Sequence, residues 1–444
     1  MTQNKKTSRR EFIATTGMAT AGLTLGVPGV KASMYNRASG SNDKIRVGII
    51  GLGRGGGLMN RFMTQPDCEI AALCDVDSDR LKRNVEGHNP ERYSDYREML
   101  DDKSIHAVVV ATPDHWHCLQ TIHAIQAGKD VFVEKPLTIT IREGRMMIDA
   151  EKNSNQIAAV GLNRRGNFTY QKLAREVPAG RIGKITFARA SRVNNMYPNG
   201  IGKFGPEKPP ENLNWDAWLG PRAYRPYQQN IAPYRFRWWS DYSSQMGNWG
   251  VHHMDVIRWM MNEQAPIAIS AHGGNFAVDD DRTIPDTMHV TYEFASGAIM
   301  TYSILEASSS RYFHSGEVEL RGTKAALFAS QGGYRIRPTS SGQFQTWEQL
   351  TDEEDFTLGD EHLIDGSSDG TVNLIRNFLD CIKSRRKPLC TLEEGHRSTS
   401  LAHLANIALV TDQKLRWDPV NEVFTNSLEG NNLLHYEYRK PYTL

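Results

Sequence analysis

Short apolar runs recur along residues 44–163, and segments with helical periodicity separate them. An uninterrupted apolar run of this kind is typical of a parallel strand that is buried on both faces. The runs lie at residues 45–50, 70–74, 107–111, 131–133 and 157–160. Helices are predicted at 77–86, 117–127 and 139–153. Regular alternation of strands and helices predicts an α/β doubly wound parallel sheet.

The pattern changes after residue 163, where apolar and polar positions begin to alternate. Such alternation predicts half-exposed strands, and it occurs at residues 184–192, 287–294, 298–305 and 316–320. Helical patterns lie at 251–261, 373–383 and 393–415. A long segment rich in Pro, Gly and aromatic residues, 195–240, precedes the first of them. The second half is therefore expected to be an α+β domain with a mostly antiparallel open sheet.

The first 32 residues are predicted to be a targeting signal that is not part of the folded protein. The segment Ser8-Arg9-Arg10-Glu11-Phe12-Ile13 resembles a twin-arginine export signal. The apolar stretch that follows is too short and too polar for a transmembrane helix, and Val30-Lys31-Ala32 fits a small-residue cleavage site. We expect a periplasmic or otherwise exported protein, with no membrane anchor after the signal is removed. The alternative is a disordered basic N-terminus.

Composition and charge exclude several classes of protein. The 444 residues are 39% hydrophobic and 23% charged, as in a soluble globular protein and unlike a collagen, a coiled coil or a disordered chain. The formal net charge is +1. Residues 1–32 hold five basic residues and one acidic residue, a net of +4, which leaves −3 for the remainder. This balance argues against nucleic-acid binding. The five cysteines include no C-x-x-C pair, so neither a disulfide framework nor a metal site is expected.

The most informative motif follows the first predicted strand directly. Residues 51–56, GLGRGG, lie between that strand and a helix, and Asp75 follows 19 residues beyond Gly56 at the tip of the second strand. Gly51 would permit the tight turn, Gly53 the approach of a pyrophosphate, and Gly56 the packing of helix on strand. Asp75 would accept hydrogen bonds from ribose hydroxyls and would repel a 2′-phosphate. The motif therefore predicts a dinucleotide site that favours NAD over NADP.

Further motifs make the resemblance to one family specific. They are residues 47–56 (VGIIGLGRGG), 111–117 (ATPDHWH), 134–136 (EKP), 161–163 (GLN) and 250–255 (GVHHMD). In this order and spacing, the chain resembles the glucose–fructose oxidoreductase/inositol dehydrogenase (Gfo/Idh/MocA) family over about residues 44–419.

The N-terminal pattern and the resemblance together imply how the chain is divided, and the resemblance implies what it binds. We expect a signal at 1–32, a linker at 33–43, an NAD-binding Rossmann domain at 44–163 and a substrate and oligomerisation domain at 164–444. A small carbohydrate substrate and a homodimer or homotetramer are implied as well. The residues expected at the cofactor are Gly51, Gly53, Arg54, Gly56, Asp75, Thr112, Pro113, His117, Glu134, Lys135 and Asn163.

The same resemblance supplies the catalytic candidates. The ammonium of Lys135 would hold a secondary hydroxyl and stabilise the developing alkoxide, and His252 would accept the hydroxyl proton as hydride passes to the nicotinamide. Asn248 and Asp255 lie about one helical turn on either side of His252. Asp255 either orients the imidazole or is a helix-surface acid. Family dehydrogenases typically carry Asp at the position of Asn248, and an amide cannot take a proton.

The residues expected on the substrate side are Arg164, Tyr197, Trp238 and His253. Trp and Tyr residues in the 195–240 segment would suit the apolar faces of a sugar. The alternative is that they form a core or an oligomer interface. His115 and His123 are expected to be structural.

Three functions remain open at this point. The first is an NAD-dependent oxidoreductase for a sugar or glycoside, which would hold its cofactor tightly because the periplasm has no evident NAD pool. The second is an NAD-dependent glycosidase that acts by transient oxidation and elimination. The third is a non-catalytic sugar-binding protein.

Overall fold

The computed structural model describes residues 44–309, 316–340, 342–344, 349–364 and 367–444. The predicted signal and linker, residues 1–43, lie outside the described residues. None of the helices in the described ranges combines the length and apolar character needed to span a bilayer.

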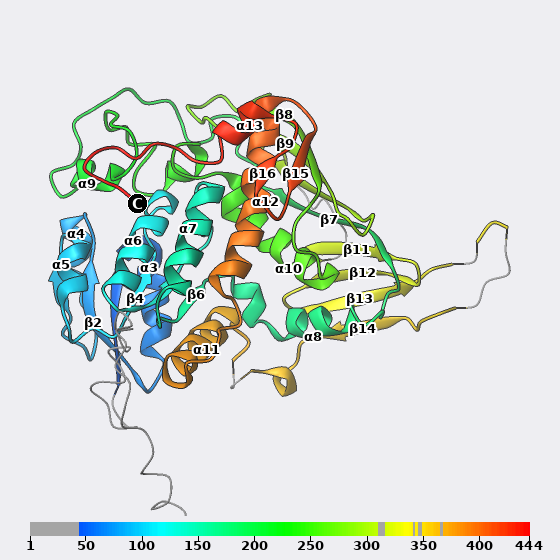
Figure 1. Ribbon diagram of the computed structural model, residues 1–444, viewed down its shortest axis with the longest axis horizontal. Coiled ribbons are helices and arrows are strands. Elements are labelled where there is room, and N and C mark those ends of the chain that lie inside the picture. Colours follow the sequence, from blue (N-terminus) through cyan, green and yellow to red (C-terminus); the bar gives the residue numbers. More distant parts are fainter. Residues whose placement is uncertain (1–43, 310–315, 341, 345–348, 365–366) are drawn as a thin grey trace, which may run out of the picture. The chain divides into compact units, whose positions relative to one another are not determined.

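The first part of the fold is a six-stranded parallel sheet in the order β3-β2-β1-β4-β5-β6. Its strands are β1 (Ile45–Ile50), β2 (Cys68–Cys74), β3 (Glu91–Tyr93), β4 (Ala107–Val110), β5 (Asp130–Val133) and β6 (Ala158–Val160). The intervening helices are α3 (Leu52–Met63), α4 (Ser78–Leu81), α5 (Tyr96–Asp101), α6 (Asp114–Gln126) and α7 (Ile141–Lys152). The predicted doubly wound sheet is confirmed (Figure 1).

Two local predictions in this part were wrong. Strand β3 was missed because two of its three residues are exposed and it has no apolar run. The helix predicted at 77–86 ends at Leu81, where α4 completes a single turn. Charged residues without an apolar stripe cannot hold a longer helix against the sheet.

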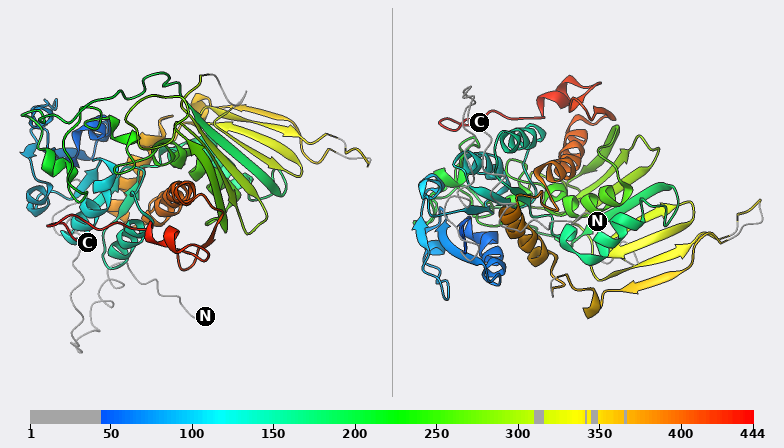
Figure 2. Two further views of the ribbon diagram at one scale, coloured as in Figure 1. Left: turned by 90° about the horizontal axis from the view of Figure 1, so that it is seen from above. Right: turned by 60° about the horizontal axis from the view of Figure 1, so that its bottom comes forward.

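Helix α11 (Gly370–Ser384) packs on the parallel sheet although it lies far along the chain. Leu374, Ile375 and Phe378 share one buried cluster with Val47 and Ile49 of β1. Figure 2 shows this helix, in orange, beside the blue helix α3. The second half of the sequence therefore supplies part of the cover of the first sheet.

The second part is a ten-stranded sheet in the order β14-β13-β12-β11-β7-β10-β9-β8-β15-β16. All its neighbouring strands are antiparallel except β7 and β10. The strands are β7 (Ile185–Val193), β8 (Ala268–Gly274), β9 (Thr287–Glu293), β10 (Ile299–Leu305), β11 (Val318–Gly322), β12 (Ala325–Ser330), β13 (Gly333–Pro338), β14 (Glu354–Thr357), β15 (Leu415–Asp418) and β16 (Val423–Phe424). This confirms the expected mostly antiparallel sheet.

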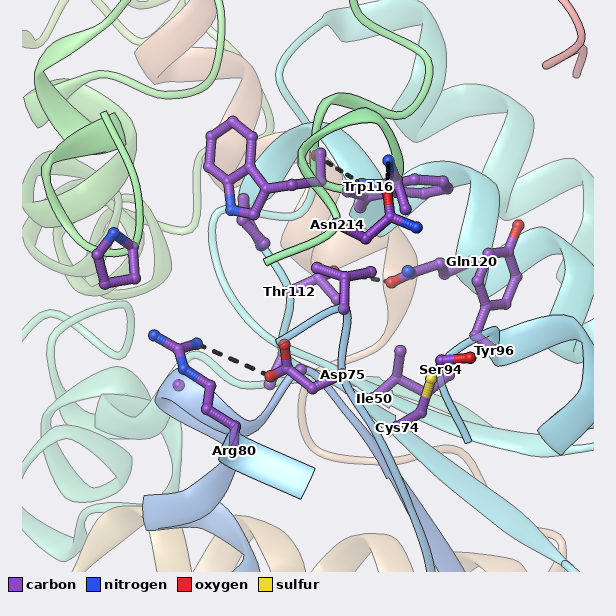
Figure 3. A pocket seen from close by; sticks show the side chains of 18 of the residues that line it. Ile50, Cys74, Asp75, Arg80, Ser94, Tyr96, Thr112, Trp116, Gln120 and Asn214 are labelled. Carbon is purple, nitrogen blue, oxygen red and sulfur yellow. Dashed lines mark hydrogen bonds and ion pairs between the residues drawn. The ribbon is translucent and has the colours of Figure 1, made fainter. Parts of the chain in front are cut away.

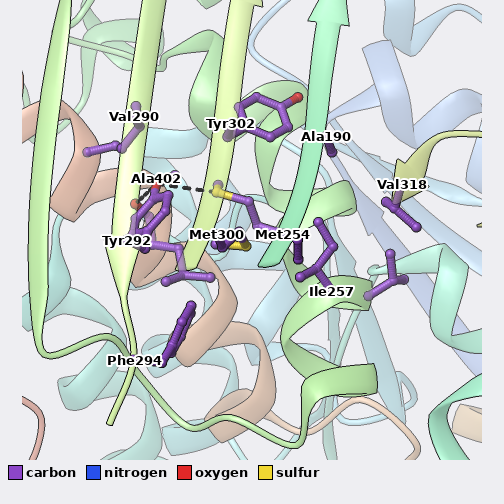
Figure 4. Packing of buried hydrophobic residues seen from close by; sticks show 14 of the residues in the cluster. Ala190, Met254, Ile257, Val290, Tyr292, Phe294, Met300, Tyr302, Val318 and Ala402 are labelled. Carbon is purple, nitrogen blue, oxygen red and sulfur yellow. Dashed lines mark hydrogen bonds between the residues drawn. The ribbon is translucent and has the colours of Figure 1, made fainter. Parts of the chain in front are cut away.

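Helices cover one face of the large sheet. They are α8 (Phe168–Glu176), α10 (Val251–Met261) and α12 (Leu392–Thr411), and the short α13 (Leu428–Asn432) follows β16. Alternate residues of β9 and β10, among them Tyr292 and Met300, point into this interface and are fully buried with Met254 of α10 (Figure 4). The packing fixes α10, which starts at the expected residue and carries His252 toward the first sheet.

Candidate active site

The glycine-rich turn joins β1 to α3 at the carboxyl edge of the parallel sheet. Gly51 has φ 87°, and a Cβ atom there would lie 2.8 Å from the carbonyl group of Ala111. Only glycine allows both this conformation and the close approach of β4. Asp75, at the end of β2, accepts a hydrogen bond from the Leu52 amide at 2.7 Å through Oδ2 and one from the Asp77 amide at 2.9 Å through Oδ1. The acid therefore holds the first turn of α3 in place.

A cavity of about 690 Å³ opens from this turn. Its lining includes six of the residues expected at the cofactor, which are Gly51, Gly53, Arg54, Asp75, Thr112 and Pro113. Figure 3 shows Asp75 and Arg80 on one side of the cavity, and Thr112, Gln120 and Tyr96 farther along it. The volume, the glycine turn and a buried carboxylate with remaining acceptor capacity fit a dinucleotide.

Five other residues expected at the cofactor do not line this cavity, and two of them stabilise its walls. The ring nitrogens of His117 lie 2.8 Å from the Pro136 carbonyl oxygen and 2.9 Å from the Thr112 carbonyl oxygen. Glu134 accepts a hydrogen bond from Arg54 Nε at 2.9 Å. His117 thus ties the turn after β4 to the turn after β5, and Glu134 ties the latter to the glycine turn. Of the other three, Gly56 lies inside α3, and the buried Oδ1 of Asn163 has no hydrogen-bond partner in the described part of the chain. The third, Lys135, bonds to Asn248.

Lys135 and Asn248 meet where the two parts of the fold come together. Nζ of Lys135 donates to the backbone carbonyl of Asn248 at 2.7 Å and to its Oδ1 at 3.2 Å. Asn248 lies in a π-helical turn, Met246–Gly250, that leads into α10. Turns of this kind are frequent at functional sites. Burial lowers the pKa of Lys135 to about 8, although the carboxylates of Glu134 and Asp114 act in the opposite direction.

His252 lies in the first turn of α10 and is buried. Its Nδ1 has no hydrogen-bond partner within the described residues. Burial, followed by the charge of Lys135, lowers the pKa of His252 well below its usual value. The imidazole is therefore neutral at neutral pH and has a ring nitrogen available to a ligand.

Asp255 was expected either to orient the His252 imidazole or to lie on the surface of the helix, and it does neither. It is completely buried, and both carboxylate oxygens accept hydrogen bonds from Arg165 at 2.8–3.0 Å. Its Oδ1 also accepts from Ser398 at 2.6 Å. The expectation that Asp255 orients His252 or lies on the helix surface is corrected, because the residue belongs to an ion pair between α10 and the turn after β6.

Two of the four substrate candidates lie together beside α10. Nδ1 of His253 lies 3.1 Å from the Tyr302 hydroxyl, and its Nε2 lies 3.5 Å from Arg164. Arg164 forms an ion pair with Glu317 at 2.8 Å. This cluster faces β10 and β11, and its hydrogen bonds connect the sheet-facing side of α10 to the strands.

The other two candidates, Trp238 and Tyr197, lie apart from this cluster and from each other. Trp238 donates its indole N–H to the buried Glu306 at 2.8 Å and belongs to an aromatic core. Its interpretation as a sugar platform is therefore corrected in favour of the core alternative. Tyr197 is 59% exposed, and its role stays a prediction.

A cation–π pair that the sequence did not predict, Trp249 with Arg192, lies next to the reactive residues. Trp249 follows Asn248, lies edge-on to His252 with ring centroids 6.4 Å apart, and carries the guanidinium of Arg192 at 3.8 Å from its ring centroid. Both side chains are partly exposed. The position of Trp249 directly after Asn248 was the available signal.

The aromatic-rich segment, whose Trp and Tyr residues were expected on the substrate side, supplies the outer wall of the dinucleotide cavity. Its residues there include Asn214, Trp218, Tyr234 and Arg237, and Tyr442, close to the C-terminus, joins them. Backbone pairing fixes part of this wall, because the Asn214 amide donates to the Val76 carbonyl at 3.0 Å directly after Asp75.

Comparison with known proteins agrees with this arrangement. Residues 45–162 match the family model for the oxidoreductase family with an NAD-binding Rossmann fold (GFO_IDH_MocA), and residues 227–413 match the model for the C-terminal alpha/beta domain of that family. The chain is 26% identical over 388 residues to a myo-inositol 2-dehydrogenase of Thermotoga maritima, covering 85% of this chain and 99% of that protein.

Two further similarities extend the picture. A glycosyl hydrolase family 109 protein of Shewanella pealeana is 29% identical over 174 residues, which are 34% of this chain and 38% of that protein. A solved structure of levoglucosan dehydrogenase in complex with NADH and levoglucosan has the same fold, with a TM-score of 0.65, 18% identity, and coverage of 87% of this chain and 100% of that one. Together with the glycine turn, Asp75 and the cavity, these matches show that the chain belongs to the Gfo/Idh/MocA oxidoreductase family and that its Rossmann domain binds NAD.

Proposed function

We propose that this protein is an exported NAD-dependent oxidoreductase that acts on a secondary hydroxyl of a sugar or glycoside. The observation that carries the proposal is the pair of hydrogen bonds from Lys135 to Asn248, which lies about one helical turn before His252. These residues do not line the dinucleotide cavity themselves, but Glu134, directly before Lys135, bonds to Arg54 in its lining. NAD, when bound, supplies the acceptor for a hydride. Relatives named as inositol dehydrogenases support a polyol or sugar substrate.

Each residue has a role that its surroundings support. Lys135 donates two hydrogen bonds to Asn248, and the third N–H group of its ammonium can bind a substrate hydroxyl and stabilise the oxygen as its proton leaves. His252 is neutral and can accept that proton. Trp249 and Arg192 offer an apolar face and a cation at the same site, which suits the C–H face and the polar edge of a sugar ring.

Export through the twin-arginine route is part of the proposal. An exported enzyme meets no evident NAD pool, so it would hold one NAD and restore it within each catalytic cycle. A second sugar or ketone would then accept the hydride in a later step. We also propose a homodimer or homotetramer, as implied by the family.

An NAD-dependent glycosidase is the second candidate. The similarity to glycosyl hydrolase family 109 proteins over 34% and 43% of the chain favours it. In such a reaction the glycoside is oxidised, the aglycone is eliminated, water adds to the unsaturated intermediate, and the hydride returns. This sequence would use the same three residues and leave NAD unchanged.

The test uses the protein purified from the compartment to which it is exported. We expect bound NAD at about one equivalent per chain, and reduction of that NAD when the substrate sugar from a panel of sugars and polyols is added. Chromogenic glycosides distinguish the glycosidase from the oxidoreductase, because release of the chromophore without net formation of NADH indicates a glycosidase. Lys135→Ala should abolish either reaction, whereas the exposed control Lys208→Ala should not. Full activity of Lys135→Ala, or a protein that neither contains nor binds NAD, would overturn the proposal.

A further inference from the structure

The last twelve residues, 433–444, run back from α13 across the first part of the fold. In Figure 1 this segment, in red, leaves α13 and ends close to α6 and α9 (Trp215–Leu219). We call it the tail, and we call residues 212–238 the strap. The tail lies beyond the C-terminal end of the second family match, at residue 413, and the strap begins before the start of that match, at residue 227.

The strap lies against the carboxyl edge of the parallel sheet. The Ser78 amide donates to the Asn212 carbonyl at 2.8 Å. The indole of Trp116 donates to the Trp218 carbonyl at 3.0 Å. Gly220 has φ 52°, and a Cβ atom there would lie 2.2 Å from the Trp116 ring, so glycine lets the strap pass directly over this tryptophan.

The tail is anchored first at a buried carboxylate. The Tyr438 hydroxyl donates to Glu143 Oε1 at 2.6 Å. Glu143 is 1% exposed, and its Oε2 accepts from the amides of Ile139 and Thr140 at 3.2 and 3.1 Å. A buried carboxylate is costly without enough hydrogen-bond donors. The Tyr438 phenol therefore supplies a donor to Glu143 Oε1 that the backbone amides at the start of α7 do not supply.

The second anchor joins the tail to the strap. The Arg439 amide donates to the Pro221 carbonyl at 2.8 Å, and its Nε donates to the Gly220 carbonyl at 3.1 Å. Its guanidinium forms an ion pair with Asp216 at 2.5 Å. In addition, the Arg222 guanidinium lies 4.1 Å from the centroid of the Tyr436 ring. Tail and strap are therefore held together as one structure.

Beyond these anchors, the tail reaches the dinucleotide cavity. Tyr442 lines it, with its ring edge-on to Trp116 at 5.3 Å, and Trp116 in turn is edge-on to Tyr96 at 5.6 Å. The glycine turn receives the pyrophosphate, and Asp75 receives the adenosine ribose. The glycine turn follows β1, Asp75 follows β2 and Tyr96 follows β3, and the strand order is β3-β2-β1. Tyr96, to which Trp116 and Tyr442 connect, therefore lies beyond Asp75 from the glycine turn (Figure 3 shows Tyr96 and Trp116). The adenine base is the part of NAD that extends there.

We infer that the tail is part of the NAD site: Tyr442 contacts the adenine end of the cofactor, and the Arg439 anchor keeps the tail closed over it. NAD cannot leave by this end without displacing the tail. The inference rests on NAD as the cofactor, but it is independent of the carbohydrate reaction, because it concerns binding and release alone.

The experiment measures NAD release from the full-length protein. Bound NADH is chased with excess NAD, and the loss of energy transfer from protein tryptophan to the nicotinamide gives the dissociation rate. Tyr442→Ala should raise this rate by about 10-fold or more, the scale of one base–aromatic contact. Arg439→Ala should raise it as well, because the tail is then no longer fixed to the strap. Glu437→Ala is the matched control, since Glu437 is an exposed tail residue, and its rate should equal that of the wild type.

A second ligand tests which end of the cofactor the tail contacts. ADP-ribose lacks the nicotinamide, so its affinity for Tyr442→Ala, measured by calorimetry, should fall by the same factor as that of NAD. Unchanged ADP-ribose affinity with weakened NAD binding would overturn the placement at adenine. Wild-type NAD release from both Tyr442→Ala and Arg439→Ala would overturn the inference as a whole. Deletion of residues 440–444, which removes neither anchor, gives the same test if a point variant does not fold.

Discussion

The Nζ atom of Lys135 donates hydrogen bonds to both oxygens of Asn248, the backbone carbonyl at 2.7 Å and Oδ1 at 3.2 Å. Lys135 follows β5 of the parallel sheet, and Asn248 lies in the turn before α10. Asn248, at the position where the family resemblance leads us to expect an aspartate, therefore accepts both hydrogen bonds from the Lys135 ammonium. An amide, unlike a carboxylate, adds no negative charge next to the ammonium, and burial keeps the pKa of Lys135 lowered to about 8.

Asn248→Asp should shift the pH dependence of turnover. A carboxylate next to Nζ favours the ammonium, so it should raise the pKa of Lys135 by about 1–3 pH units. If the ammonium is the active form, activity falls as pH rises through the pKa of Lys135, and the variant should keep its activity to correspondingly higher pH. Profiles of kcat against pH for wild type, Asn248→Asp and the exposed control Asn84→Asp measure this. Superimposable alkaline limbs would argue against Lys135 as the titrating group.

His252→Ala should lower kcat by about 10²–10⁴-fold, the usual contribution of general acid–base catalysis. NAD affinity and the thermal midpoint should change little, because Nδ1 makes no hydrogen bond within the described residues. His253→Ala is the comparison, since that imidazole contacts Tyr302 and Arg164. It should affect stability more than kcat. The reverse order of the two kcat losses would move the base to His253.

Asp75→Ala should weaken NAD binding by about 1–3 kcal/mol, since hydrogen bonds to a charged acceptor are lost and the Leu52 amide loses its partner. Asp75→Asn keeps an oxygen for that amide but removes the charge. It should therefore bind NAD better than the alanine variant does, and it should discriminate less against NADP. Calorimetric titration of both variants with both nucleotides checks this. Equal NAD affinity in wild type and Asp75→Ala would remove the proposed contact with the ribose.

Asp255→Asn should destabilise the protein by about 1–3 kcal/mol, because the buried guanidinium of Arg165 loses one carboxylate and keeps only that of the partly exposed Glu394. Asp380→Asn is the control, since that carboxylate is 60% exposed in its pair with Arg376, and it should cost less than about 1 kcal/mol. Chemical denaturation measures both. At temperatures where the protein stays folded, kcat of Asp255→Asn should equal that of the wild type, whereas a residue that oriented His252 would change kcat.

Local patterns were sufficient for the elements that bury one continuous apolar surface. The run at 45–50, the glycine turn and Asp75 follow one another within one βαβ unit, and each can be recognised from its neighbouring residues. Helix α10 begins and ends at the predicted residues, Val251 and Met261. In contrast, α12 was predicted to continue to residue 415, but it ends at Thr411, where Asp412 takes a left-handed conformation with φ 48° before β15 begins.

The sequence by itself determined the two-part fold, the NAD turn and the candidate residues Lys135 and His252. Only the tertiary structure decided which side chain each of them contacts. Asn248 bonds to a lysine 113 positions earlier, Asp255 pairs with an arginine 90 positions earlier, and Tyr442 reaches Trp116 from the end of the chain. A polar side chain is compatible with many partners, and the one it acquires is set by the packing of distant elements, which leaves no periodicity in the neighbouring sequence.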